Sequence, residues 1–232
     1  MARDRLNKLD ITQRQLDCAI RLMFDEADPI PIHTLLFAAG EVLQDLCRVR
    51  GVVSEFDQAM NDLIKPEYRK QMHQLWRKRA LFLKHAKTDP EAEMEKIGPE
   101  LNDIYALSAT MRYRTLTANI STPMTVFAAW FGWVHPGSMK KPPNPAYKKI
   151  QKLHAGFSRS EQLLFGRLYL TVHEGRSNDT ETVLDDFERR FPEAKNRAFD
   201  MMDELSRDAG LTAWELPRRY RTRIQLPSST SD

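Results

Sequence analysis

The sequence predicts an all-α protein, and three observations support this prediction. Apolar residues recur at steps of three and four along most of the chain, which is the spacing of one helix face. No segment alternates apolar and polar residues with the period of two typical of strands, and no hairpin turn signal occurs. Capping residues, prolines and glycines stand where one periodic segment ends and the next begins.

Three helices are expected between residues 11 and 64. Thr12 and Gln15 have the spacing of a capping box and predict the start of the first helix. Its apolar face comprises Leu16, Ala19, Ile20 and Met23. The segment ADPIP ends this helix, and a second is expected over residues 32–51. Ser54 predicts the cap of a third helix, whose apolar residues are Phe56, Ala59, Met60, Leu63 and Ile64.

Three more helices are expected before residue 138. Pro66 suits the first turn of a fourth helix, which extends to about His85 and has a strongly basic polar side. The fifth follows Gly98 and carries the apolar residues Leu101, Ile104, Tyr105, Leu107 and Met111. A sixth begins at Thr122, and the HPG segment at 135–137 ends it; its packing residues are Phe127, Trp130 and Phe131.

The clearest change of composition lies at KKPPNPAYKKIQK, residues 140–152, where three prolines stand among five lysines. We therefore expect a helical bundle over 1–139, a Pro/Lys-rich linker over 140–157, and a small helical region over 158–216. Ser158 and Glu161 should cap the first helix of that region, and the last should run from Pro192 to Gly210. Residues 217–232 are basic and then polar, and a flexible tail is expected there.

Composition is that of a soluble globular protein, with 29% charged and 41% hydrophobic residues. The formal net charge of +3 is too small to predict a nucleic-acid binder by itself. Cys18 and Cys47 each fall in an amphipathic segment, which favours reduced core thiols in a cytoplasmic protein. No secretory signal is recognisable, and the most apolar stretch, MTVFAAWFGWV, has about half the length of a membrane span. We expect a cytoplasmic protein without a membrane segment.

Common catalytic and nucleotide-binding motifs are absent from the sequence. It contains no GxxxxGK[ST], GxGxxG, HExxH or GxSxG pattern. The six histidines are scattered, and no two have the four-residue helical spacing of a metal-binding pair. Neither a metal nor another cofactor is therefore expected. His173, close to Gly175, has the position of a cation that stabilises a helix C-terminus.

One pair of residues has the chemistry of metal-independent RNA cleavage. Arg79 and His85 are separated by five residues at the end of the fourth expected helix. A histidine can take the proton of a ribose 2′-hydroxyl, and an arginine can stabilise charge on the phosphorus centre. The same helix end offers Arg77, Lys78 and Lys84 as nucleic-acid contacts.

Three stretches resemble bacterial all-helical proteins of the HEPN-like superfamily: residues 11–46, 81–95 and 128–137. The resemblance covers roughly the first 137 residues and implies a HEPN-like bundle with a helical C-terminal extension. Many members carry an arginine and, a few residues later, a histidine at the end of a long helix, and two protomers bring these motifs together in a dimer cleft. Here Arg79 and His85 match that spacing, whereas Ala80 stands where active members usually have a polar residue.

Two functional hypotheses follow. The first is a non-enzymatic interaction or scaffold module that forms a homodimer, in which the Arg79/His85 motif has decayed. The second is a metal-independent endoribonuclease of the toxin or phage-defence type, which uses an Arg/His pair across a dimer cleft. The residues favour the first hypothesis, and the family resemblance supports the second. The partners expected are a second copy of the chain and either RNA or another protein.

Overall fold

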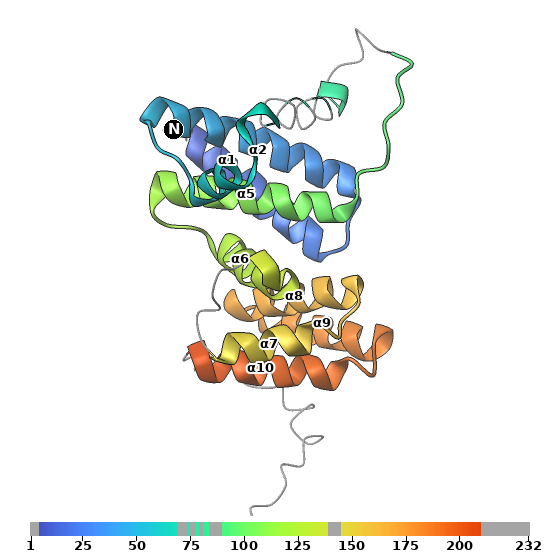
Figure 1. Cartoon of the computed structure of the whole chain (residues 1–232). Helices are drawn as coiled ribbons and strands as arrows, with labels where there is room; N and C mark the ends of the chain where they lie inside the picture. Colours follow the sequence, from blue (N-terminus) through green and yellow to red (C-terminus); the bar gives the residue numbers. More distant parts are fainter. Residues whose placement is uncertain are drawn as a thin grey trace, which may run out of the picture. The chain divides into compact units, whose positions relative to one another are not determined.

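The computed structural model describes residues 5–68, 74, 78, 81–83, 90–138 and 145–209. Within these residues every regular element is helical, which confirms the all-α prediction (Figure 1). The chain divides into two compact units, Met1–Gly132 and Trp133–Asp232, and the division falls inside helix α6, Thr122–Val134. Among the described helices, none combines the length and the apolar character that crossing a membrane requires.

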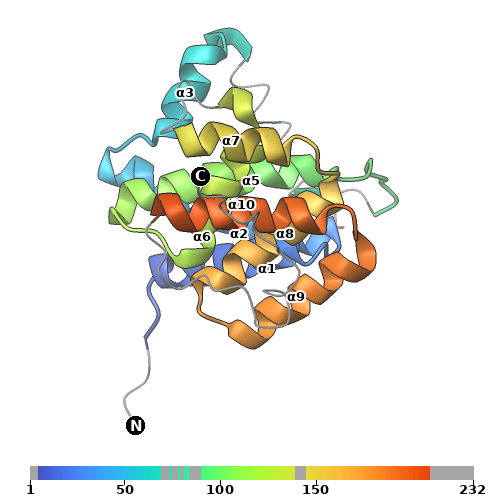
Figure 2. The same cartoon turned by 90° about the horizontal axis from the view of Figure 1, so that it is seen from below.

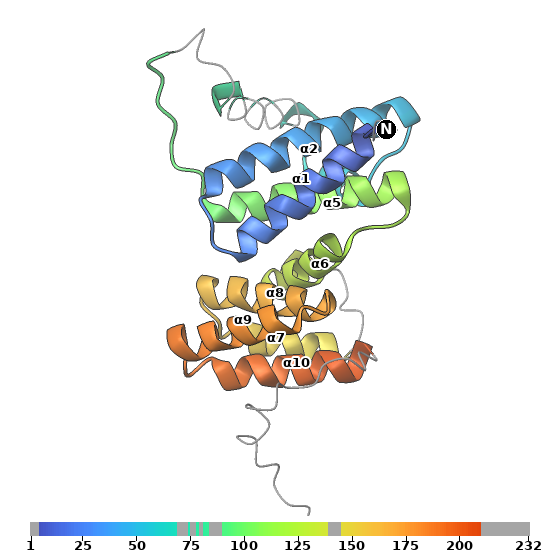
Figure 3. The ribbon, with the colours of Figure 1, turned by 180° about the vertical axis from the view of Figure 1, so that it is seen from behind.

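The first unit is built around three long helices that lie against one another: α1 (Lys8–Phe24), α2 (Pro29–Arg50) and α5 (Pro99–Thr117). Figures 1 and 3 show these helices side by side from opposite directions. A shorter helix, α3 (Glu55–Leu63), packs on α5. The apolar face predicted for the first helix is confirmed, because Leu16, Ala19, Ile20 and Met23 are all buried.

Helix α1 begins earlier than its expected capping box. The Asn7 side chain accepts a hydrogen bond from the Asp10 backbone N–H at 2.9 Å, and the Asp10 carboxylate accepts one from the Asn7 N–H at 2.9 Å. This reciprocal pair satisfies donors that the first turn of a helix leaves open. The Thr12 hydroxyl instead donates to the Leu9 carbonyl, so the predicted cap at Thr12 is wrong.

Helix α2 also begins before its expected start at residue 32. Asp28 caps it by accepting a hydrogen bond from the Ile30 N–H at 2.8 Å, and Pro29 occupies the first helical position. A proline there costs no hydrogen bond, because the first-turn N–H groups have no intrahelical acceptor. At the other end Gly51 adopts a left-handed conformation with φ of 66°, and the predicted end of the helix is confirmed.

Helix α5 is more polar inside than the sequence suggests. Ile104, expected on its apolar face, is 39% exposed, whereas the buried residues include Asn102, Asp103, Ser108, Thr110 and Arg112. Two of these side chains supply hydrogen bonds inside the unit: Asn102 bonds to His33 and to the Pro29 carbonyl, and Arg112 bonds to Asp57. Helix α6, by contrast, is apolar on nearly all sides, and Met124, Val126, Phe127 and Trp130 are fully buried.

The described residues of the second unit form four longer helices: α7 (Pro145–His154), α8 (Arg159–His173), α9 (Ser177–Arg190) and α10 (Lys195–Ala209). Helix α8 packs on α9, and α7 lies along α10 (Figures 1 and 2). A short 3₁₀ helix, Pro136–Ser138, precedes them. The predicted Ser158–Glu161 capping box is confirmed. Helix α10 begins at Lys195 rather than Pro192, because residues 192–194 form a turn.

Part of the segment expected to be a linker is a packed helix. Within 140–157, residues 145–154 form α7, whose Ile150 and His154 are buried. Three of the five lysines that predicted a linker lie instead on the exposed side of this helix, at Lys148, Lys149 and Lys152, and the other two lie outside the described residues. Prolines cannot continue a helix but can begin one, so Pro145 stands at its first position. The tail predicted at 217–232 lies outside the described residues.

Candidate functional site

The residues of the predicted RNA-cleaving motif lie outside the described part of the chain. This holds for Arg79 and His85 and also for Arg77 and Lys84. Lys78 is described, and it is helical and exposed. The catalytic pair and its basic neighbours therefore remain predictions from the sequence. The polar arrangements that the structure describes lie elsewhere, at the contact between α3 and α5, beside α2, and in the second unit.

A partly buried ion pair joins α3 to α5. The Arg112 guanidinium donates from Nε to Asp57 Oδ2 at 2.9 Å and from Nη2 to Asp57 Oδ1 at 2.6 Å. The Ser54 hydroxyl donates to the same carboxylate at 2.7 Å. The Arg112 side chain is 8% exposed and that of Asp57 27% exposed. A two-pronged, charge-assisted contact of this kind fixes the position of α3 on α5.

Cys47 lies within electrostatic reach of this pair. Burial raises the pKa of the Cys47 thiol, and the Arg112 guanidinium opposes that rise only in part. The thiol is therefore protonated at neutral pH and is a poor nucleophile. The prediction that Cys47 is a core residue is confirmed, whereas Cys18 is exposed and the same prediction for it is wrong.

An open cleft of about 320 Å³ lies between α3 and α5. It is lined by Glu55, Met111, Arg114, Thr115 and Ala118. Glu55 stands in the first turn of α3 and Arg114 in the last turn of α5. In the part of the chain that the structure describes, neither the Glu55 carboxylate nor the Arg114 guanidinium has a hydrogen-bond or ion-pair partner. The cleft thus presents two opposite charges, and we call it the α3–α5 cleft.

His33 is part of the interior of the first unit. Its ring is fully buried, and its Nδ1 lies 3.0 Å from Asn102 Oδ1. The Asn102 amide nitrogen donates to the Pro29 carbonyl at 3.0 Å, so the amide oxygen is the acceptor and His33 Nδ1 is the donor. Tyr105 packs edge-on against the imidazole with the ring centroids 4.8 Å apart. A histidine enclosed in this way holds α2 to α5 and cannot reach a substrate.

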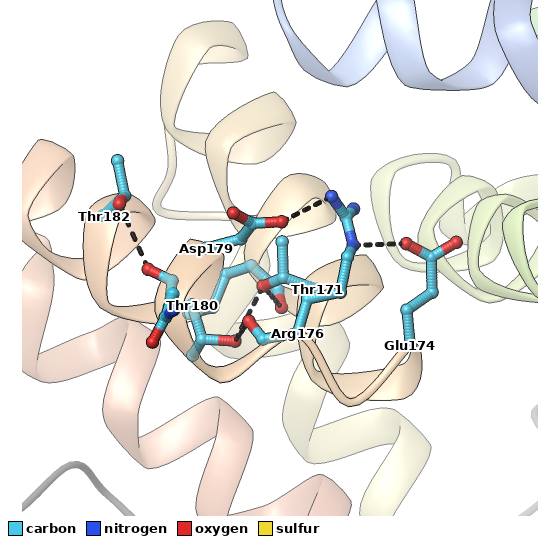
Figure 4. Close-up of polar contacts among 8 residues, drawn as sticks. Thr171, Glu174, Arg176, Asp179, Thr180 and Thr182 are labelled. Atoms are coloured by element: carbon cyan, nitrogen blue, oxygen red, sulfur yellow. Dashed lines mark hydrogen bonds and ion pairs between the residues drawn. The ribbon is translucent and has the colours of Figure 1, made fainter.

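The corner between α8 and α9 carries a second polar group (Figure 4). Arg176 bridges two carboxylates, with Nε 2.7 Å from Glu174 Oε2 and Nη1 2.7 Å from Asp179 Oδ2. Beneath it the Thr180 hydroxyl donates to Thr171 Oγ1 at 3.1 Å. An open cleft of about 420 Å³ lies here, lined by residues 175–179. Because two carboxylates already neutralise Arg176, this corner is a poor site for an anion.

His154 is buried among aromatic rings in the second unit. Trp133, Phe157 and Phe165 surround it, with ring centroids 5.6–6.2 Å from its own. Neither ring nitrogen hydrogen-bonds to another described residue, and burial lowers the pKa of His154 to about 3. His173 differs from its prediction as a helix-end cation: burial lowers its pKa too, which favours the neutral ring.

The described residues include no group of three His, Cys, Asp or Glu side chains that could hold a metal ion. Comparison of the chain with family models, with curated proteins and with solved structures gave no match. The site therefore has to be judged on its own geometry. Sequence reasoning missed the Arg112–Asp57 pair and the α3–α5 cleft, because their residues come from helices far apart in the chain and no local pattern links them.

Proposed function

We propose that this protein is a non-enzymatic interaction module that forms a homodimer through the surface around α3. The observation that carries the proposal is where apolar side chains are exposed. The described residues include ten exposed large hydrophobic side chains, and six of them lie between residues 49 and 81. These six are Val49, Val52, Val53, Leu63, Tyr68 and Leu81. All six come from one segment of the chain, and exposed apolar residues that lie together on one face are typical of an interaction surface.

The apolar side chains of helix α3 are not buried within its own chain. The helix contains no buried residue, and its Leu63 side chain is 79% exposed. The partly buried Arg112–Asp57 pair, rather than a buried apolar face, fixes it on α5. Covering a fully exposed leucine contributes roughly 2 kcal/mol, so a partner that covers Leu63 and its neighbours gains appreciable free energy.

A second copy of the chain is the partner that this surface suits best. The exposed residues next to Leu63 in the chain carry both signs of charge, with Asp62 and Glu67 on either side of Lys65. A surface of mixed charge complements an identical surface when a two-fold axis relates them, because each acid can then meet a base of the other copy. A partner whose surface carries charge of a single sign would complement this surface less well.

The test compares two variants in sedimentation equilibrium. Leu63→Glu places a charge on the proposed surface, and Ile11→Glu places the same charge on α1, where Ile11 is 44% exposed. We expect wild type and Ile11→Glu to dimerise and Leu63→Glu to be monomeric, with the helical circular dichroism of all three unchanged. A wild-type chain that stays monomeric at about 100 μM, a concentration at which a weak dimer with a Kd near 10 μM is mostly formed, would refute the proposal.

The second candidate is the metal-independent endoribonuclease, which the spacing of Arg79 and His85 favours. If it is correct, wild type cleaves RNA in the presence of a chelator and His85→Ala does not. Leu63→Glu should also lose the activity, because the active site needs two protomers. No cleavage of several unrelated RNAs, at concentrations where the dimer is formed, would exclude this activity and leave the interaction module.

A further inference from the structure

We propose that the α3–α5 cleft is the polar contact of the dimer, in which Glu55 pairs with Arg114 of the partner subunit and Arg114 pairs with Glu55 of the partner subunit. This inference rests on the proposed homodimer and names the residues that set its geometry. The cleft holds one acid and one base that have no partner among the described residues of the same molecule. A two-fold axis through such a surface brings each charge opposite its complement, and both contacts form at once.

The ion pair that holds α3 on α5 lies next to Glu55 and Arg114 in the chain. Asp57, two residues after Glu55, is held by two hydrogen bonds to Arg112, two residues before Arg114. This pair fixes the register of α3 on α5 and leaves the cleft between the other two charges. The cleft is open, so a second molecule can reach both charges.

Helix dipoles also stabilise each of the two charges in a monomer. Glu55 stands at the N-terminal turn of α3, where the helix dipole favours a negative charge. Arg114 stands in the last turn of α5, where the dipole favours a positive charge. Met111 and Ala118 form the apolar part of the cleft. When a partner excludes water from this cleft, the two ion pairs strengthen because the local dielectric constant falls.

Charge exchange gives a specific test. Glu55→Arg should place like charges opposite each other twice in a homodimer, and so should Arg114→Glu. We expect each single variant to dimerise at least about tenfold more weakly than wild type, the effect of roughly 1.4 kcal/mol. An equimolar mixture of the two variants should form a heterodimer, because each of its two contacts again joins an acid to a base. The double variant Glu55→Arg/Arg114→Glu should recover the homodimer.

Glu100→Arg is the matched control, because Glu100 is an exposed glutamate in the first turn of α5, as Glu55 is in α3. It should dimerise as wild type does, and sedimentation equilibrium measures all six samples. If wild type is a dimer and Glu55→Arg is as dimeric as Glu100→Arg, the pairing is wrong while the proposed dimer stands. Single variants that are weakened but not rescued in the mixture likewise overturn the pairing. A wild-type chain that never dimerises overturns the proposed function itself.

Discussion

Lowering the pH from 7 to 5 is expected to destabilise the protein through His154. Burial lowers the pKa of its imidazole from 6.5 to about 3, and the charge of Arg159 also lowers it. The folded state therefore has the lower pKa, and the unfolded chain binds more protons below pH 6.5. The stability that the neutral ring contributes is complete above pH 6.5 and is lost progressively as the pH falls toward 3.

The size of this effect follows from the pKa values. One pKa unit corresponds to about 1.36 kcal/mol, so a pKa moved from 6.5 to about 3 amounts to roughly 5 kcal/mol when the loss is complete. At pH 5 the folded protein still holds a neutral ring, whereas the unfolded chain is almost fully protonated at this position. The loss of unfolding free energy between pH 7 and pH 5 is then about 2 kcal/mol. That is a large fraction of the stability of a typical domain.

Urea unfolding at pH 7, 6 and 5, followed by tryptophan fluorescence, measures this loss. Carboxylates with ordinary pKa values remain largely ionised over this range and contribute little to the change. His154→Phe replaces the imidazole with a ring that does not titrate among Trp133, Phe157 and Phe165. The variant should lose about 2 kcal/mol less than wild type between pH 7 and 5. Equal losses in the two proteins would show that His154 is not the group responsible.

Three further substitutions test the packing directly, each by urea unfolding at pH 7. Asp57→Asn leaves the buried Arg112 guanidinium without its carboxylate and should cost about 3 kcal/mol; a cost below about 0.5 kcal/mol would mean that the pair does not hold α3 to α5. Ser158→Ala removes one half of a capping box and should cost about 1 kcal/mol, whereas Ser158→Thr should stay close to wild type. Phe165→Ala creates a cavity at a fully buried position and should cost roughly 3–5 kcal/mol, against almost nothing for Val49→Ala at an 84% exposed position.

The helices were predictable because their signals are local. The Ser158–Glu161 box and the glycine at 51 each lie within a few residues of the element that they begin or end. Where one stretch of sequence had two interpretations, the predicted helix boundary or linker was wrong. Thr12 offered a box inside the first helix, whereas Asn7 and Asp10 formed one earlier in the chain and gained a further turn. The lysines near residue 148 suggested a linker, because from sequence alone a solvated helix face and a solvated linker look alike.

The candidate site was less predictable, because its residues are far apart in the sequence. Asp57 and Arg112 are 55 residues apart in the chain, and Ser54 already explained Asp57 as part of a helix start. The environment of each histidine was equally hard to predict. The sequence could not show that His33 and His154 are enclosed, since burial depends on which other helices cover them. Arg79 and His85 remain a prediction from spacing and resemblance, outside the described residues.

Local signals in the sequence were enough to predict that this protein is all-α, where α2 ends and α8 begins, and which face of α1 is buried. These features follow from periodicity and capping, which act over a few residues. The tertiary structure was needed to show that a partly buried ion pair fixes α3 and that Glu55 and Arg114 line one cleft. Such features depend on which helices meet and in which register, and no local pattern in the chain specifies that.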